Sequence, residues 1–225
     1  MPYNKLQKGI VVNMSENGVR INKYLSEAGV CSRREADKMV EAGRVCIDGI
    51  TAVSGSKVLD GQKVTLDGKN VKKEEEEIYL AFYKPKGIVC TTASEENGEK
   101  IKNVVEYINY DKRIYPVGRL DQASEGLLLM TNQGDVMEKI LRSRYGHEKE
   151  YFVKVDHKVT DEFLKKMGQG VPILDTVTKP CKVWKEDDYS FHIILTQGLN
   201  RQIRRMCEYF GYRVVHLRRD RIMNI

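Results

Sequence analysis

The chain has 225 residues, of which 41% are hydrophobic and 31% are charged, and its formal net charge is +6. This length suits a medium-sized domain together with a small one, each able to bury a core, and the composition is that of a globular protein. No apolar run reaches membrane-spanning length, and the N-terminus lacks the apolar core of a signal peptide. These features argue against an integral membrane protein or a secreted one, and we expect a cytoplasmic protein that does not bind membranes.

Cysteine and histidine are the residue types that would indicate a disulfide framework or a metal site. The five cysteines and four histidines are scattered along the chain, and no Cys-x-x-Cys pair occurs. We therefore expect reduced thiols and no metal. The chain also lacks a glycine-rich phosphate loop.

The N-terminal part predicts a small module of two helices and short strands. Residues 1–17 show no periodicity and are expected to form a flexible arm. Apolar residues then recur at helical spacing from Val19 to Gly29. A second helix is expected to start at Ser32, because Ser32 and Glu35 have the spacing of a capping box.

A change to alternating polarity near Val45, with three Asp-Gly pairs at 48–49, 60–61 and 67–68, predicts short strands joined by tight turns. We place this module at residues 18–71. The charged run KKEEEE at 72–77 is interpreted as a linker, and a second domain is expected at 78–225.

The second domain mixes strands and helices irregularly, which favours an α+β fold with a mixed, largely antiparallel sheet and flanking helices. The expected strands are two around a turn at Lys84-Pro85-Lys86-Gly87, two around a loop within 114–132, one at Tyr151–Val155, a hairpin at Lys182–Thr196 turning at Asp187-Asp188, and one at Val214–Leu217. The expected helices are Val104–Ile108, Asp135–Arg142, one opened by Thr160, and one with an apolar stripe from Ile203 to Phe210.

Positive charge is concentrated near the C-terminus. The segment Asn200–Arg221 contains seven arginines and only two acidic residues. Arginine suits forked contacts to phosphate, although a solvated helix face is an alternative interpretation of such a run.

A second basic cluster lies at the expected N-terminus of the helix that Ser32 caps, where Arg33 and Arg34 would attract phosphate. A solubilising surface pair is the alternative. The segment VRINKYLSEAGVCSRREADKMVEAGRVCIDGITAVSGSKV resembles the RNA-binding domain named after the fourth small-subunit ribosomal protein. The resemblance implies RNA binding by the paired helices. The residues expected on the RNA face are Arg20, Ser32, Arg33, Arg34 and Lys57.

Asp121 follows Gly118-Arg119-Leu120 in a loop between apolar segments. A loop aspartate is by itself usually a turn former or a helix cap. The segment YPVGRLDQASEGLLLMTNQGD, however, closely resembles the signature of pseudouridine synthases. The resemblance implies that Asp121 is the essential carboxylate of the reaction.

Three further segments resemble motifs of the same family in the family's order. KPKG matches the first, for which we expect a structural role. KEYFVKV matches the second and implies that Tyr151 contacts the target base, although a strand tyrosine is more often core. GLNRQIRRMCEYFGYRVVHLRRDRI matches the third and implies that Arg204 pairs with Asp121; a pair with Glu208 is the alternative. Arg119, Arg201 and Arg205 are expected to contact RNA or solvent.

The resemblance runs from about Val19 to the C-terminus. The domain pairing is that of the ribosomal RNA branch of the pseudouridine synthases, and the C-terminal segment is most similar to the large-subunit synthase F type. It implies a cofactor-free isomerase, which we expect to be a monomer, acting on a uridine of ribosomal RNA. Whether Asp121 attacks the sugar or base, or removes a ribose proton, stays open.

Three alternatives remain. A synthase acting on transfer RNA would carry the same catalytic residues. A non-catalytic ribosome assembly factor would not need Asp121, Tyr151 and Arg204 together. A metal-dependent nuclease would need clustered carboxylates, and only Glu125 is near Asp121 in sequence.

Overall fold

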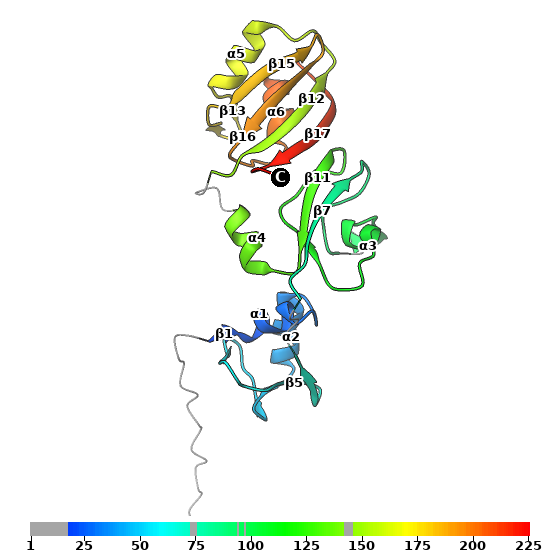
Figure 1. The fold of residues 1–225 in the computed structure, drawn as a ribbon, viewed down its shortest axis with the longest axis vertical. Helices are drawn as coiled ribbons and strands as arrows, with labels where there is room; N and C mark the ends of the chain where they lie inside the picture. The colour runs from blue at the N-terminus through cyan, green and yellow to red at the C-terminus, as the bar shows by residue number, and fades with distance from the viewer. Residues whose placement is uncertain (1–17, 73–75, 94, 97, 142–145) are drawn as a thin grey trace, which may run out of the picture. The chain divides into compact units, whose positions relative to one another are not determined.

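The computed structural model describes residues 18–72, 76–93, 95–96, 98–141 and 146–225 (Figure 1). The expected arm at 1–17 and the centre of the expected linker, 73–75, lie outside the described residues. The chain divides into two compact units, Met1–Glu76 and Glu77–Ile225.

The N-terminal unit has two helices whose ends follow local sequence signals. Helix α1 covers Ile21–Glu27 and α2 covers Arg33–Glu41. The Ser32 side chain accepts from the Glu35 backbone N–H at 3.2 Å, and the Glu35 carboxylate accepts from the Ser32 N–H at 2.7 Å. The expected capping box is therefore confirmed, and it satisfies two N–H groups that the helix itself cannot.

Short strands complete this unit. They are β1 (Val19–Arg20), β2 (Val45–Ile47), β3 (Ile50–Thr51), β4 (Lys57–Val58), β5 (Val64–Leu66) and β6 (Lys69–Val71). Strand β1 pairs with β4, and the other four form a sheet in the order β3-β2-β5-β6. Asp48 and Gly49 both have positive φ (49° and 80°) between β2 and β3, as a tight hairpin turn requires. The core packs Leu25, Ala36 and Val45 together.

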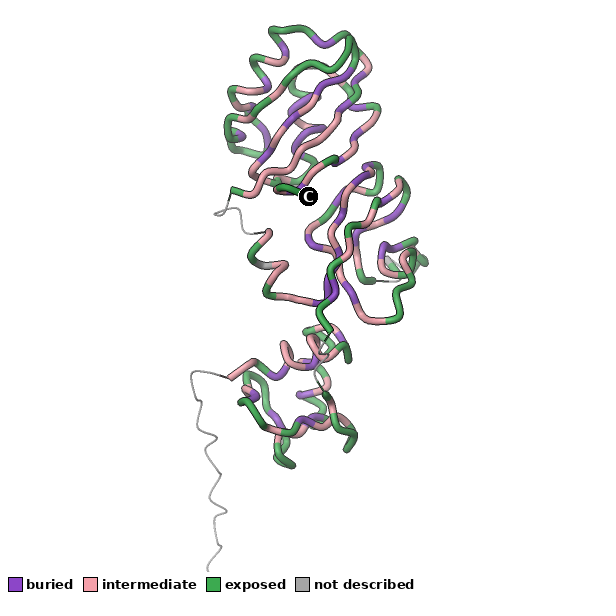
Figure 2. The backbone as a smooth tube through the Cα atoms, in the orientation of Figure 1, coloured by how far each residue is buried: buried purple, intermediate pink, exposed green. Residues whose placement is uncertain are grey.

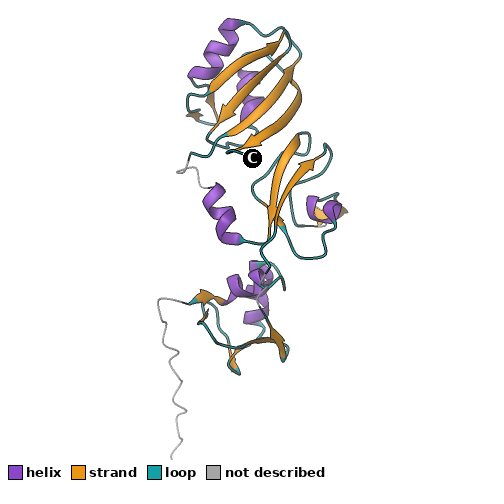
Figure 3. Cartoon of the chain, viewed as in Figure 1, coloured by secondary structure: helices purple, strands orange, loops and turns teal. Residues whose placement is uncertain are grey.

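The C-terminal unit contains a seven-stranded sheet (Figure 3). Its strands are β7 (Tyr79–Lys84), β10 (Tyr115–Pro116), β11 (Glu125–Thr131), β12 (Lys149–Val155), β15 (Lys182–Asp187), β16 (Ser190–Leu195) and β17 (Val214–Ile222). The order is β10-β11-β17-β12-β16-β15, with β7 also paired to β11. Among the described strands of this sheet only the β11–β17 pair is parallel, so the sheet is mixed and largely antiparallel, as expected from the sequence.

Helices and short hairpins complete the unit. They are β8 (Glu95–Glu96), β9 (Glu99–Lys100), α3 (Val104–Ile108), α4 (Gly134–Leu141), α5 (Asp161–Gln169), β13 (Pro172–Ile173), β14 (Thr176–Val177) and α6 (Gln202–Tyr209). Figure 1 shows α6 behind the sheet and α5 beside β15. Helices α5 and α6 share a buried cluster with the β12, β16 and β17 side chains Val153, Ile193 and Leu217. Along β16 and β17 buried positions alternate with partly buried or exposed ones (Figure 2).

The elements expected in the second domain are present with three corrections, and Arg142, at the end of one expected helix, lies outside the described residues. The strand expected after Lys84-Pro85-Lys86-Gly87 is only an isolated bridge between Val89 and Asn103, because this segment packs beside α3 rather than on the sheet. The β15–β16 turn is at 188–189, since Asp187 pairs with Ser190. Strand β17 continues to Ile222, because its second half pairs with β12.

No helix of the described residues is long and apolar enough to cross a membrane.

Candidate active site

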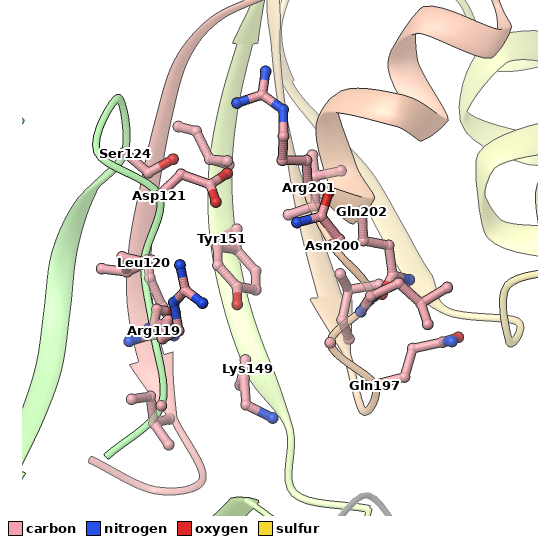
Figure 4. Close-up of a pocket in the computed structure, with 18 of the residues that line it drawn as sticks. Arg119, Leu120, Asp121, Ser124, Lys149, Tyr151, Gln197, Asn200, Arg201 and Gln202 are labelled. Carbon is pink, nitrogen blue, oxygen red and sulfur yellow. Dashed lines mark hydrogen bonds between the residues drawn. The ribbon is translucent and has the colours of Figure 1, made fainter. Parts of the chain in front are cut away.

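A pocket of about 580 Å³ opens in the C-terminal unit between the loop before β11, strands β12 and β17, and the start of α6 (Figure 4). Asp121, Tyr151 and Arg201 all line it, although they lie far apart in the sequence. In Figure 4 the ring of Tyr151 lies between the loop that carries Asp121 and the segment that carries Arg201. The sheet therefore brings the residues of three predicted motifs to one cavity.

Asp121 lies in the turn that leads into β11. The Asp121 carbonyl accepts from the Ser124 backbone N–H at 3.0 Å, which closes the turn. The Asp121 side chain is 36% exposed, so its carboxylate is open to the pocket. A carboxylate at this place can approach a bound group while the turn holds its backbone still.

Arg204 belongs to α6 and is 9% exposed. Its guanidinium donates to the carbonyls of Val214 and Ala123, at 3.3 and 3.1 Å, and to the Ser124 hydroxyl at 3.3 Å. Its Nε lies 4.0 Å from Asp121 Oδ2.

Arg204 is thus turned toward the Asp121 loop, and among the described residues no ion pair joins it to Glu208. Burial lowers the pKa of Arg204, with a smaller contribution from Arg201, and Asp121 opposes the shift. The buried cation stays charged beside a carboxylate, because an arginine is not deprotonated in proteins.

Tyr151 lies on β12, and its side chain packs against both buried clusters of the C-terminal unit. It therefore marks their junction, where the pocket opens. A ring fixed at this place offers a flat face to a planar group.

The remaining predicted arginines have different surroundings. Arg119 and Arg201 are exposed and line the pocket, and Arg201 adopts a positive φ of 50° just before α6. Arg205 does not line it; its guanidinium donates to the backbone and side-chain oxygens of Asn200, at 3.1 and 3.3 Å. Arg201, just before α6, therefore lines the cavity, whereas Arg205 on α6 does not.

Two basic residues close to the Asp121 loop, Lys84 and Arg219, are buried. Lys84, from the KPKG motif, is fully buried and donates to the Pro85 and Ile88 carbonyls at 2.8 and 2.9 Å. Burial lowers the pKa of Lys84, and Cys90, Asp121 and Glu125 oppose the shift. These hydrogen bonds support a structural role for Lys84, which holds the turn after β7, and the Gly87 N–H of that turn donates to the Gln122 carbonyl at 2.8 Å.

The second is Arg219, which is 3% exposed and lines the pocket. Its Nε donates to the Leu127 carbonyl at 2.7 Å, and its Nη1 donates to the Arg119 carbonyl at 3.4 Å. A Cβ at Gly126 would meet the Arg219 carbonyl oxygen at 2.3 Å, so only glycine permits this approach of β11 to β17. Arg219 therefore fixes the backbone on both sides of Asp121.

In the N-terminal unit, the predicted RNA-binding residues gather around two features. Arg33 and Arg34 are exposed in the first turn of α2, and the Ser32 hydroxyl caps that helix. Arg20 is paired with Lys57 across the β1–β4 ladder. Both features present positive charge at the surface.

Among the described residues, no group of three or more His, Cys, Asp or Glu side chains is arranged to hold a metal ion.

A mixed sheet with a cationic pocket around one carboxylate and one aromatic ring fits an enzyme that acts on a base of a nucleic acid. A family model described as RNA pseudouridylate synthase matches residues 78–209, and an S4 domain model matches residues 19–62. The chain belongs to the RNA pseudouridylate synthase family, and it is an enzyme that isomerises uridine in RNA.

Curated relatives agree with this assignment. The chain is 53% identical to a dual-specificity RNA pseudouridine synthase RluF of Salmonella typhi, over 94% of this chain and 73% of the relative. It is 34% identical to a ribosomal large subunit pseudouridine synthase B of Bacillus subtilis, over 89% of this chain and 84% of the relative. A solved pseudouridylate synthase structure aligns with a TM-score of 0.65 and 25% identity, over 92% of this chain and 90% of that one.

Proposed function

We propose that this enzyme converts a specific uridine of large-subunit ribosomal RNA to pseudouridine, in the cytoplasm, with Asp121 as the catalytic carboxylate. The approach of Arg204 Nε to within 4.0 Å of Asp121 Oδ2 in the pocket that Tyr151 also lines carries the proposal. The reaction breaks the bond from ribose C1′ to uracil N1, turns the ring and joins C1′ to C5.

Each of the three residues has a task that its surroundings support. Asp121 must be ionised to attack or to remove a proton, and the charge of Arg204 favours that form. The target base must leave the RNA stack, which costs a few kcal/mol. Stacking on the Tyr151 ring offsets part of that cost.

RNA binding is assigned to both units. Arg20, Arg33, Arg34 and Lys57 suit phosphates of a folded RNA, and Arg119, Arg201 and Arg205 suit the strand that enters the pocket. The names of the relatives support ribosomal RNA as substrate, because one is a ribosomal large subunit synthase.

A transfer RNA is the second candidate substrate, since the similar RluF proteins are named dual-specificity enzymes. The test maps pseudouridine in ribosomal and transfer RNA from cells with and without the gene, and from cells that carry an Asp121→Asn copy. We expect one large-subunit site to disappear in the deletion and in the Asp121→Asn strain. A complete pseudouridine pattern in both strains would contradict the proposal.

A further inference from the structure

The charge in the pocket is strongly asymmetric. Among the described residues that line it, Asp121 is the only acid, whereas four are cations: Arg119, Lys149, Arg201 and Arg219. Arg119 and Arg201 are exposed, and Arg219 already holds two backbone carbonyls. Lys149 differs from the other three cations, because it neither holds the backbone of the Asp121 loop nor lies exposed at the surface.

Lys149 begins β12, two residues before Tyr151, so both side chains project from the same face of the strand. Figure 4 shows Asp121, Tyr151 and Lys149 in succession along the pocket, with the phenol end of the ring toward Lys149. A base stacked on Tyr151 would therefore have Asp121 at one edge and Lys149 at the other.

The Lys149 amine is partly buried without a carboxylate partner among the described residues. The amine donates to the His147 carbonyl at 3.3 Å. Burial lowers the pKa of Lys149, and the nearby positive charge of Arg219 lowers it further. A half-buried ammonium costs free energy unless an acceptor arrives, and a bound substrate can supply one.

We propose that Lys149 is a catalytic residue of this site that donates to a carbonyl oxygen of the target uracil and stabilises the negative charge that the ring carries during the reaction. The proposal rests on the function proposed above. It names the part of the substrate that Lys149 contacts, which is the base rather than a phosphate.

The reaction creates a negative charge that such a cation would stabilise. When the C1′–N1 bond breaks, the bonding electron pair stays on the uracil and spreads over N1, O2 and O4. The ring then turns, C5 forms the new bond to C1′, C5 loses its proton, and N1 gains one. Atoms and electrons balance without a co-reactant, and a fixed ammonium beside O2 or O4 acts only while the charge is present. A donor at O4 would also favour uracil over cytosine, because an amino group replaces the O4 acceptor in cytosine.

The experiment compares Lys149→Met, which keeps the length of the side chain, with Lys149→Arg, which keeps the charge. The matched control is Lys154→Met, an exposed lysine of the same strand. Thermal unfolding checks the fold, and Lys149→Gln replaces Lys149→Met if the latter does not fold. Single-turnover rates are measured on saturating RNA, together with the affinity at several salt concentrations.

We expect Lys149→Met to slow the bound reaction about 100-fold, the scale for loss of one charge-stabilising donor. RNA affinity and its salt dependence should stay those of the wild type, and Lys149→Arg should keep part of the rate. A second substrate carries 5-fluorouridine at the target position, and its reaction is followed by the loss of that nucleoside. On this substrate Lys149→Met should lose less rate relative to the wild type than on uridine, because fluorine already stabilises the ring anion.

Lys149→Met could instead react at the normal rate once RNA is bound, but bind RNA more weakly and with a salt slope lowered by about one. That result would show that Lys149 contacts a phosphate, and it would overturn the proposal. An equal defect on uridine and 5-fluorouridine would overturn it as well. Asp121→Asn is run in parallel: activity in that variant would refute the proposed function, whereas an inert Asp121→Asn with a fully active Lys149→Met would refute only the role of Lys149.

Discussion

Replacing Asp121 with asparagine separates a catalytic carboxylate from a turn residue. Asparagine has nearly the same size and serves turns almost as well, so the Asp121–Ser124 turn should persist. The substitution removes only the negative charge and the basicity of the carboxylate. Both covalent attack and proton removal need the ionised oxygen, so the reaction should stop by either route.

The structure limits the effect of this substitution on stability. A charge pair at 4.0 Å is worth about 4 kcal/mol at an effective dielectric constant of about 20 and about 1 kcal/mol in water. Because the Asp121 side chain is 36% exposed, the value in water is the better guide. We expect the free energy of unfolding to change by about 1 kcal/mol or less, whereas the rate should fall about 10⁴-fold or more.

The assay uses RNA tritiated at uracil C5, because C5 loses its hydrogen when the new glycosidic bond forms. Wild-type enzyme should release tritium and Asp121→Asn should not, while RNA affinity stays the same or rises. Asp175→Asn is a matched control, since Asp175 lies in the turn between β13 and β14 with a positive φ of 57°. Tritium release by a folded Asp121→Asn protein at near wild-type rate would refute the assignment.

The remaining predictions concern the partner of Asp121 and the RNA-binding unit. Arg204→Ala should abolish turnover and also lower the free energy of unfolding by about 2–4 kcal/mol, because three hydrogen bonds are lost. Arg204→Lys should recover stability more than rate. Near-normal turnover in either variant would argue against a functional pair between Arg204 and Asp121. The double variant Arg33→Ala and Arg34→Ala should bind RNA more weakly, and the slope of log affinity against log salt concentration should fall by about one per lost phosphate contact. The reaction rate of bound RNA should not change. Filter binding across a salt series measures the slope, and an unaltered slope would contradict the prediction. Limited proteolysis should cut first within residues 72–77, and early cleavage elsewhere would count against a linker there.

The candidate site was partly accessible from the sequence because motif resemblance places residues without knowledge of their packing. The resemblance singles out Asp121, Tyr151 and Arg204 in this way. In the structure Asp121 and Tyr151 line the pocket, and Arg204 Nε lies 4.0 Å from Asp121 Oδ2. Lys149 and Arg219 were missed. Each is one basic residue in a strand, and a strand lysine or arginine is usually a surface residue.

The arginine-rich segment illustrates the same limit. Its charge favours phosphate contacts or a solvated helix face, but the residues separate in the structure. Arg204 and Arg219 are buried, Arg218 pairs with Asp220 at 2.5 Å, and Arg221 pairs with Glu150 at 2.9 Å. Strand β17 alternates its side chains between the two faces of the sheet, so neighbouring arginines point in opposite directions.

What the sequence by itself determined are the features that depend on neighbours along the chain. The capping box at Ser32, the Asp-Gly turn between β2 and β3, and the apolar stripe of α6 each involve residues only a few positions apart. Only the tertiary structure decided the parallel contact of β11 with β17, where Gly126 meets Arg219 across 93 positions of the chain. Such contacts depend on packing between distant segments, and local patterns carry no information about them. The site depends on that contact, because it places the Asp121 loop beside Arg204 and Tyr151.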